Sequence, residues 1–184
     1  GRSFSPLLYY LSPKRSSNNT VRVVIVGDCE IAPHESRSSF VSVNLAAILA
    51  AGEKKVLIVD ADMRKGHLHE AFGLARENGL SEFVAGSIKI GEAIRKTCIP
   101  NLHMVTTGVL PPNPSELLLH KRFINLLKVL SEQYDHVIVD SPPVLAVTDA
   151  GIVGQLAGAS LMVLKAGVHP MREIEASVKR LRQA

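Results

Sequence analysis

Five short apolar runs, separated by stretches with helical character, constrain the fold more than any other feature of the chain. Each run is nearly continuous in apolar residues, as in strands that are buried on both faces of a sheet. Because strands that alternate with helices build parallel sheets, the pattern predicts an α/β fold, a doubly wound, mostly parallel sheet with helices on both faces. The runs are residues 21–26, 56–59, 102–106, 137–139 and 160–164.

Three stretches carry helical signals. Residues 40–51 predict a helix that ends on Gly52, a common residue just after a helix C-terminus. Residues 113–133 predict a longer helix that Asn113 can cap, in a capping-box-like pattern, and residues 171–181 predict a last helix. The apolar stripe expected on the longer helix comprises Leu117, Ile124, Leu127 and Leu130.

One compact domain is expected from 184 residues, of which 46% are hydrophobic. Residues 1–20 are interpreted as an N-terminal arm and linker, with a short helix or arm at the apolar patch 7–11, and residues 21–184 as the domain. No run approaches the roughly 18 apolar residues of a membrane helix, so we expect a soluble chain. The net charge of +4, with both signs mixed along the chain, does not support a nucleic-acid partner.

Acidic residues stand at the ends of two expected strands. Asp60 and Asp62 follow the second run, and Asp140 follows the fourth. Because parallel sheets bind ligands at the carboxyl ends of their strands, we expect these carboxylates at one site. A single such Asp is explained as well by capping of the next turn. Three at two strand ends favour a Walker B arrangement, in which Mg²⁺ is held beside nucleotide phosphates directly or through water.

The segment after the first run departs from a phosphate-binding loop. Such a loop needs glycines for close backbone approach, then a lysine and a serine or threonine at the start of a helix. Residues 27–40 read GDCEIAPHESRSSF, in which Gly27 is the only glycine and no Gly-Lys pair occurs. Glu35 adds negative charge where phosphates should lie, so weak or absent ATP binding is one expectation.

Four ordered segments carry a specific set of motifs: 40–46 (FVSVNLA), 60–66 (DADMRKG), 111–118 (PPNPSELL) and 140–150 (DSPPVLAVTDA). From about Val21 onward, the chain thereby resembles the bacterial tyrosine kinases, the cytoplasmic domains of capsule and exopolysaccharide chain-length and export proteins. The resemblance implies a deviant P-loop ATPase fold, and compared with that fold we expect this chain to be truncated at its C-terminus and to lack the last strand. It also implies Mg²⁺ and ATP or ADP as cofactors, and a place on the cytoplasmic side of the bacterial inner membrane.

The resemblance also implies roles for individual residues. Asp60 would be the base for the attacking tyrosine hydroxyl, while Asp62 and Asp140 would position Mg²⁺. The family's Gly-Lys-Ser falls on residues 37–39 when counted back from the downstream helix, or on residues 36–38 when counted forward from the start of the loop, and the sequence leaves both registers open. The nucleotide-binding candidates are Ser36, Arg37, Ser38, Ser39 and Phe40, with Ser39 also a metal ligand.

The family's partners follow from the same resemblance. They are a membrane adaptor domain with transmembrane helices, outside this chain, and the tyrosine-containing tail of a neighbouring subunit. This chain lacks the family's tyrosine cluster and has only Tyr9, Tyr10 and Tyr134. Of the spaced arginines that assemble the family's ring only Arg2 fits, with Ser5 at the next position, which weakens the expectation of self-association into a ring.

Three functional hypotheses remain open at this point. The leading one is an ATP- and Mg²⁺-dependent protein tyrosine autokinase domain that regulates exopolysaccharide or capsule production and is impaired by its altered loop. The second is a catalytically dead, nucleotide-poor scaffold module of the same family. The third is a partitioning-type ATPase, against which the motifs at 63–66 and 111–118 argue.

Overall fold

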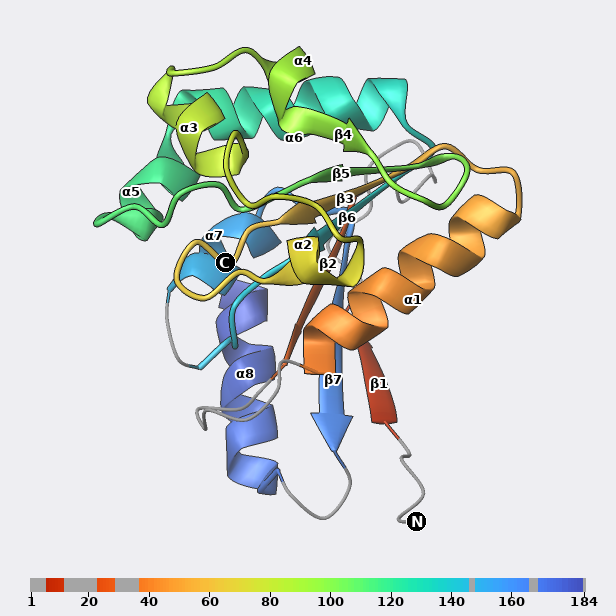
Figure 1. Ribbon diagram of the computed structural model, residues 1–184. Coiled ribbons are helices and arrows are strands. Elements are labelled where there is room, and N and C mark those ends of the chain that lie inside the picture. Colours follow the sequence, from red (N-terminus) through yellow and green to blue (C-terminus); the bar gives the residue numbers. More distant parts are fainter. Residues whose placement is uncertain (1–5, 12–22, 29–36, 146–147, 166–168, 184) are drawn as a thin grey trace.

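The computed structural model describes residues 6–11, 23–28, 37–145, 148–165 and 169–183. These residues build one seven-stranded sheet with helices on both faces (Figure 1). The strands are β1 (Pro6–Leu11), β2 (Val23–Asp28), β3 (Val56–Asp60), β4 (Ile94–Lys96), β5 (Leu102–Val105), β6 (His136–Asp140) and β7 (Ala159–Lys165). Their order is β1-β7-β2-β6-β3-β5-β4, which confirms the predicted α/β sheet.

The five central strands are parallel, and both edge strands are antiparallel to their neighbours. The edge strand β1 corrects one expectation, because the patch at 7–11 was interpreted as a short helix or arm. It instead pairs with β7 along its whole length, from Pro6 opposite Lys165 to Leu11 opposite Ser160. Tyrosine and leucine suit a strand once an open sheet edge is available, and that edge is supplied from far along the sequence.

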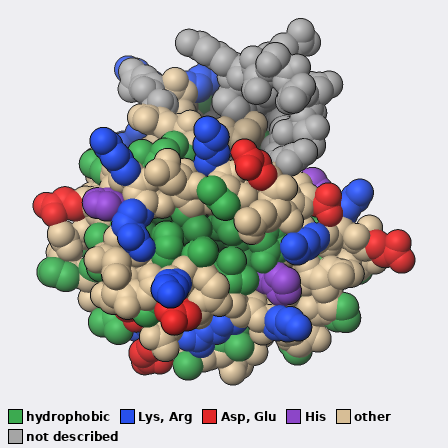
Figure 2. All heavy atoms as spheres, turned by 90° about the horizontal axis from the view of Figure 1, so that it is seen from above, with side chains coloured by type: hydrophobic (Ala, Val, Ile, Leu, Met, Phe, Trp, Pro, Cys, Tyr) green, Lys and Arg blue, Asp and Glu red, His purple; other side chains and the backbone are tan. Residues whose placement is uncertain are grey.

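Eight helices occur in the described part of the chain: α1 (Arg37–Ala51), α2 (Leu68–Ala71), α3 (Leu80–Ala85), α4 (Ile90–Ala93), α5 (Pro114–Leu119), α6 (Lys121–Gln133), α7 (Asp149–Gly154) and α8 (Met171–Gln183). In Figure 1, α1 lies on one face of the sheet, and α3, α4 and α6 lie on the other. Figure 2 views the molecule from above this second group and shows hydrophobic side chains at the centre, with charges of both signs around them.

The helix predicted over 113–133 is two helices, α5 and α6, and this is a second correction. His120 has an extended backbone, and its Nδ1 accepts a hydrogen bond from Arg122 N, so it caps α6 and resets the helical phase. Consequently Ile124 of the predicted stripe is 40% exposed. The buried residues of α6 are Phe123, Leu126, Leu127 and Leu130.

The central strands are buried on both faces, as their composition predicts. In β3, Val56 and Ile58 pack with α1, while Leu57 and Val59 join the larger cluster beneath α6. This two-sided burial fixes the strands, so that the side chains following them are held at a constant sheet edge. No helix in the described ranges is long and apolar enough to cross a membrane.

Candidate active site

Two of the three predicted carboxylates lie side by side at the carboxyl edge of the sheet. Asp60 ends β3 and Asp140 ends β6, and the two are register partners in adjacent parallel strands. Both are buried, with 0% and 2% of their surface exposed. Asp62 follows two residues after Asp60 and is half-buried. The sequence-based expectation that these groups would share one edge therefore agrees with the structure.

Asp60 is held by the backbone of the loop that follows it. Its Oδ1 accepts a hydrogen bond from Asp62 N at 3.2 Å, and its Oδ2 accepts one from Leu68 N at 3.1 Å. Burial raises the pKa of Asp60 to about 6; the Thr107 hydroxyl and the Leu68 N–H oppose this shift, and the Asp62 charge adds to it. Asp60 is thus ionised at neutral pH and becomes protonated as the pH falls through about 6.

Gly66 closes this loop over Asp60 and was not recognised as structural from the sequence. A Cβ at Gly66 would lie 1.9 Å from Thr107 Oγ1, 2.6 Å from Asp62 O and 2.7 Å from Asp60 Oδ1. Only a glycine fits in this space. Within the described ranges, Thr107 Oγ1 is buried and makes no hydrogen bond of regular geometry, although it is close enough to lower the pKa of Asp60.

Asp140 is held by side chains of α1. Ser39 Oγ donates to Asp140 Oδ2 at 2.7 Å, and Ser42 Oγ donates to Asp140 Oδ1 at 2.8 Å. Burial raises the pKa of Asp140 well above its ordinary value, the charge of Asp60 adds to this, and the two hydroxyls oppose it. Ser42 was missed from the sequence, although its spacing of three from Ser39 places both on one helix face.

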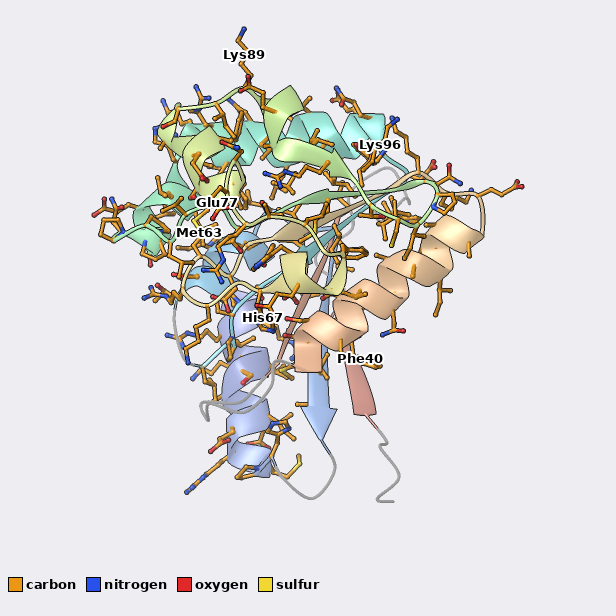
Figure 3. All side chains as sticks on the ribbon, in the orientation of Figure 1. Phe40, Met63, His67, Glu77, Lys89 and Lys96 are labelled. Carbon is orange, nitrogen blue, oxygen red and sulfur yellow. The ribbon has the colours of Figure 1, made fainter. Side chains whose placement is uncertain are left out.

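The other nucleotide-binding candidates are distributed around the start of α1. Ser36 lies outside the described residues, and Arg37 is the first residue of the helix. Ser38 is buried. Phe40 is 64% exposed and projects from the outer side of α1 (Figure 3), so only its backbone can serve a site at the sheet edge.

The donor set fits Mg²⁺ in the way that a nucleotide site holds it. Among the residues that the structure places, no group of three acidic, His or Cys side chains surrounds a metal position. Mg²⁺ beside phosphates needs only one or two protein oxygens, because water and phosphate complete its octahedron. Ser39 and Asp140 provide such oxygens in direct contact, and Asp62 adds a third that is half-buried.

A second polar network lies beside the carboxylates. Arg64 Nε donates to Asp149 Oδ2 at 2.9 Å, and Ser115 Oγ donates to Asp149 Oδ1 at 2.6 Å. Arg64 Nη2 also donates to Ser115 Oγ at 3.2 Å. Asp149 is fully buried. The three residues belong to the segments 60–66, 111–118 and 140–150, whose motifs were noted in the sequence without a role for these side chains.

Comparison with known proteins agrees with this geometry. Residues 38–166 match the family described as AAA domain, so fold and site define a P-loop domain of that class. "Tyrosine-protein kinase ptk" of Acinetobacter johnsonii is 46% identical over 150 residues, which cover 82% of this chain and 20% of that protein. "The kinase domain of Escherichia coli tyrosine kinase ETK" superposes with a TM-score of 0.83 at 40% identity, covering 88% of this chain and 62% of that one.

The chain belongs to the bacterial tyrosine kinase family, as its motifs predicted. It spans about a fifth of the length of the curated relatives that it matches. A more distant structure is the septum site-determining protein MinD complexed with Mg-ADP from Pyrococcus horikoshii OT3, at 23% identity and a TM-score of 0.60. The match covers 75% of this chain and 55% of the MinD chain, and it shows the shared fold alone.

Proposed function

We propose that this chain is the nucleotide-binding kinase domain of a longer tyrosine autokinase that acts in capsule or exopolysaccharide production. The hydrogen bond of 2.7 Å from Ser39 Oγ to Asp140 Oδ2 carries this proposal. It joins a hydroxyl at the start of a helix to a strand-end carboxylate, the two oxygen donors that a Mg²⁺-nucleotide site needs.

The same contact favours one register of the altered loop. If Ser39 is the metal-binding serine, the family's Gly-Lys-Ser falls on residues 37–39, and Ser38 stands at the lysine position. Ser38 is neutral and buried, so this position brings no cation to the β- and γ-phosphates. We therefore propose that the domain binds nucleotide weakly.

In the proposed reaction, Ser39, Asp140 and Asp62 would hold Mg²⁺ directly or through water, and the bound ion would neutralise phosphate charge. The tyrosine hydroxyl of a neighbouring subunit's tail loses its proton to Asp60 as its oxygen bonds to the γ-phosphorus. The bond between that phosphorus and the bridging oxygen breaks, which releases ADP. A pKa of about 6 suits a base at neutral pH, and each Asp60 oxygen, which accepts one backbone N–H, keeps a further lone pair that could take the proton.

The wider setting belongs to the proposal as well. A membrane adaptor with transmembrane helices would hold the domain at the cytoplasmic side of the bacterial inner membrane. The phosphorylated tyrosines would lie in a tail outside this chain. Tyr134 does not suit that role, because it is 5% exposed and its hydroxyl lies 2.7 Å from His103 Nδ1.

The test is a calorimetric titration of the chain with ADP, with and without Mg²⁺, alongside Ser38→Lys and Ser39→Ala. We expect Mg²⁺-dependent binding that Ser39→Ala removes and that Ser38→Lys strengthens at least about tenfold, since a charged hydrogen bond to phosphate is worth roughly 1.5–3 kcal/mol. Ser131→Lys on α6 adds the same charge far from the site and should change nothing. No heat with Mg²⁺ and millimolar ADP would overturn the kinase proposal.

The second candidate is a nucleotide-poor scaffold with the same fold. The observation that favours it is the serine at the lysine position, in the register supported by the Ser39–Asp140 contact. It predicts that Ser38→Lys gains measurable binding from a wild type that has none. That outcome would show that the nucleotide site is located correctly, but that the wild-type chain does not bind nucleotide and acts as a scaffold.

A further inference from the structure

Three sequence motifs meet in one network around a single buried carboxylate. Arg64 comes from the loop after β3, Ser115 from the first turn of α5, and Asp149 from the first turn of α7. The Arg64 guanidinium contacts both Asp149 oxygens, at 2.9 Å and 3.4 Å, and Ser115 Oγ donates to one of them at 2.6 Å. In the described part of the chain this is the only ion pair, and its carboxylate side is 0% exposed.

We infer that Arg64 is a positioning residue, which holds the loop that presents Asp62 to the metal by tethering it to Asp149 and Ser115. The inference rests on the proposed function, since Asp62 matters only if Mg²⁺-nucleotide binds. It adds to that function a set of three side chains that touch neither metal nor nucleotide. Their task is to fix the distance between the two segments that carry the strand-end carboxylates.

The contacts of Asp62 support the first step. Asp62 Oδ1 accepts hydrogen bonds from Arg64 N and Lys65 N, both at 3.1 Å, and Asp62 O accepts one from Gly66 N at 2.7 Å. The orientation of Asp62 is therefore set by the backbone of the residues just after it. Arg64 takes part twice, because its N–H binds Asp62 while its side chain binds Asp149.

The location of Asp149 supports the second step. It lies nine residues after Asp140, at the start of α7, and α7 packs against α5. A tether from Arg64 to Asp149 thus joins the loop after β3 to the segment after β6. Arginine suits this task better than lysine, because its planar fork reaches both carboxylate oxygens and Ser115 in one fixed geometry.

Burial makes the tether specific. A fully buried carboxylate must keep a charged or hydrogen-bonded partner, so Asp149 selects the conformation in which Arg64 faces it. Arg64 itself is 39% exposed, so the loop gains a fixed position without burying a second full charge. Partners that orient metal-binding groups in this way change metal affinity without contacting the metal.

The experiment compares Arg64→Lys, Ser115→Ala and the double variant Arg64→Met/Asp149→Leu with the wild-type chain. The double variant replaces the ion pair by apolar groups and so avoids a lone buried charge that could prevent folding. Arg122→Lys is the matched control, because Arg122 Nε donates to Phe83 O on the α3 side of the molecule. Two quantities are measured: hydrogen exchange of the backbone amides at positions 64 and 65, and the Mg²⁺ concentration at half-maximal ADP binding.

We expect Arg64→Lys and the double variant to raise the half-saturating Mg²⁺ concentration about tenfold, as is typical for such orienting partners. ADP affinity without metal should stay within about twofold, and both amides should exchange about tenfold faster, because opening of the loop becomes easier. Ser115→Ala should give a smaller change in the same direction, and Arg122→Lys none. A folded double variant with unchanged amide exchange would overturn the inference.

The two proposals can fail separately. If the wild-type chain binds no ADP with Mg²⁺, the proposed function fails, and amide exchange alone decides whether Arg64 holds the loop. If binding occurs and the variants alter amide exchange without altering the Mg²⁺ requirement, Arg64 has a structural role only, and the positioning inference is rejected while the function stands.

Discussion

The regions around Asp60 and Asp140 each supply hydrogen-bond donors to a buried strand-end carboxylate, but the donor groups differ. Each carboxylate ends a central strand, is buried and accepts two hydrogen bonds. Asp60 accepts both from backbone N–H groups of the loop that follows it, whereas Asp140 accepts both from serine hydroxyls of α1. The first carboxylate is fixed by the chain itself, and the second by side chains that can turn away.

This difference suggests different roles for the two carboxylates: Asp60 fixes the loop, whereas Asp140 can exchange its hydroxyl donors for a metal ion. A backbone N–H cannot leave its acceptor unless the loop moves, and an unpaired buried N–H is costly. A hydroxyl rotates freely and can donate to one oxygen while its own lone pairs face a cation. We therefore expect Asp60 to matter most for folding of the loop, and Asp140 with Ser39 to matter most for metal binding.

The largest expected effect tests that separation directly. Asp60→Ala should unfold more easily than Asp140→Ala by about 4 kcal/mol, because it leaves two N–H groups without acceptors at roughly 2 kcal/mol each. Both variants also remove a buried carboxylate whose pKa is raised, mainly by burial, so this part of the change has the same sign in each. Urea denaturation of the metal-free proteins measures the difference. Equal stabilities would show that the two regions do not differ in this way.

The pH dependence sharpens the role of Asp60. Its pKa is raised from 3.8 to about 6 on folding, so its contribution to stability is fully present below about pH 4 and is lost as the pH rises through 6. The wild type should therefore lose about 2.4 kcal/mol more than Asp60→Asn between pH 4 and pH 7.5. The comparison with Asp60→Asn is needed because His69 and His103, whose pKa values are lowered mainly by burial, give the opposite slope.

A constant stability gap between these two proteins across the pH range would contradict the raised pKa of Asp60. Denaturation midpoints in urea at three pH values suffice. The metal-free chain is used, since bound Mg²⁺ would favour ionised carboxylates and mask the effect.

Gly66 tests how tightly the loop closes over Asp60. Gly66→Ala should cost about 2 kcal/mol, because the new methyl group would meet Thr107 Oγ1 and the Asp62 carbonyl, and overpacking typically costs 1–3 kcal/mol. Gly91→Ala in α4 is the matched control, since nothing lies within 4 Å of its added Cβ. The control should be neutral or slightly stabilising. Similar thermal midpoints for both variants would argue that the loop is loosely packed.

The smallest expected effect has the opposite sign. Asp140→Asn should stabilise the metal-free chain by about 1 kcal/mol, because it removes a buried charge beside Asp60 and keeps an acceptor for one serine. The same variant should lose Mg²⁺-dependent ADP binding. Asp135→Asn, at an exposed position, should change neither property. Destabilisation by Asp140→Asn would place Asp140 with Asp60 as a structural anchor.

The sequence predicted those parts of the molecule whose cause is local or strongly periodic. The central strands were found because burial on both faces leaves continuous apolar runs, and the strand-end carboxylates followed from them. The break at His120 was missed because both halves of 113–133 are helical and only the phase changes between them. Strand β1 was missed because its partner β7 lies about 150 residues later.

The sequence predicted the acidic residues of the site, but not the residues that hold them in position. Asp60, Asp62 and Asp140 carry a sequence signal, since each stands at a strand end. Ser42 and the Arg64–Asp149 pair carry none of that kind, because the contact depends on how α1, α5 and α7 fold back over the sheet. Gly66 was visible in the sequence, but the need for glycine there appears only once Thr107 is placed across from it.

Strand β1 has a practical consequence for anyone who produces this domain. By covering the outer side of β7, it occupies backbone groups that another molecule could otherwise pair with. A shortened version that starts after Leu11 would leave a row of N–H and C=O groups open on a long parallel-sheet edge. Such a version would be prone to join edge to edge into aggregates, so cloning boundaries chosen from the central P-loop fold alone would remove its protection.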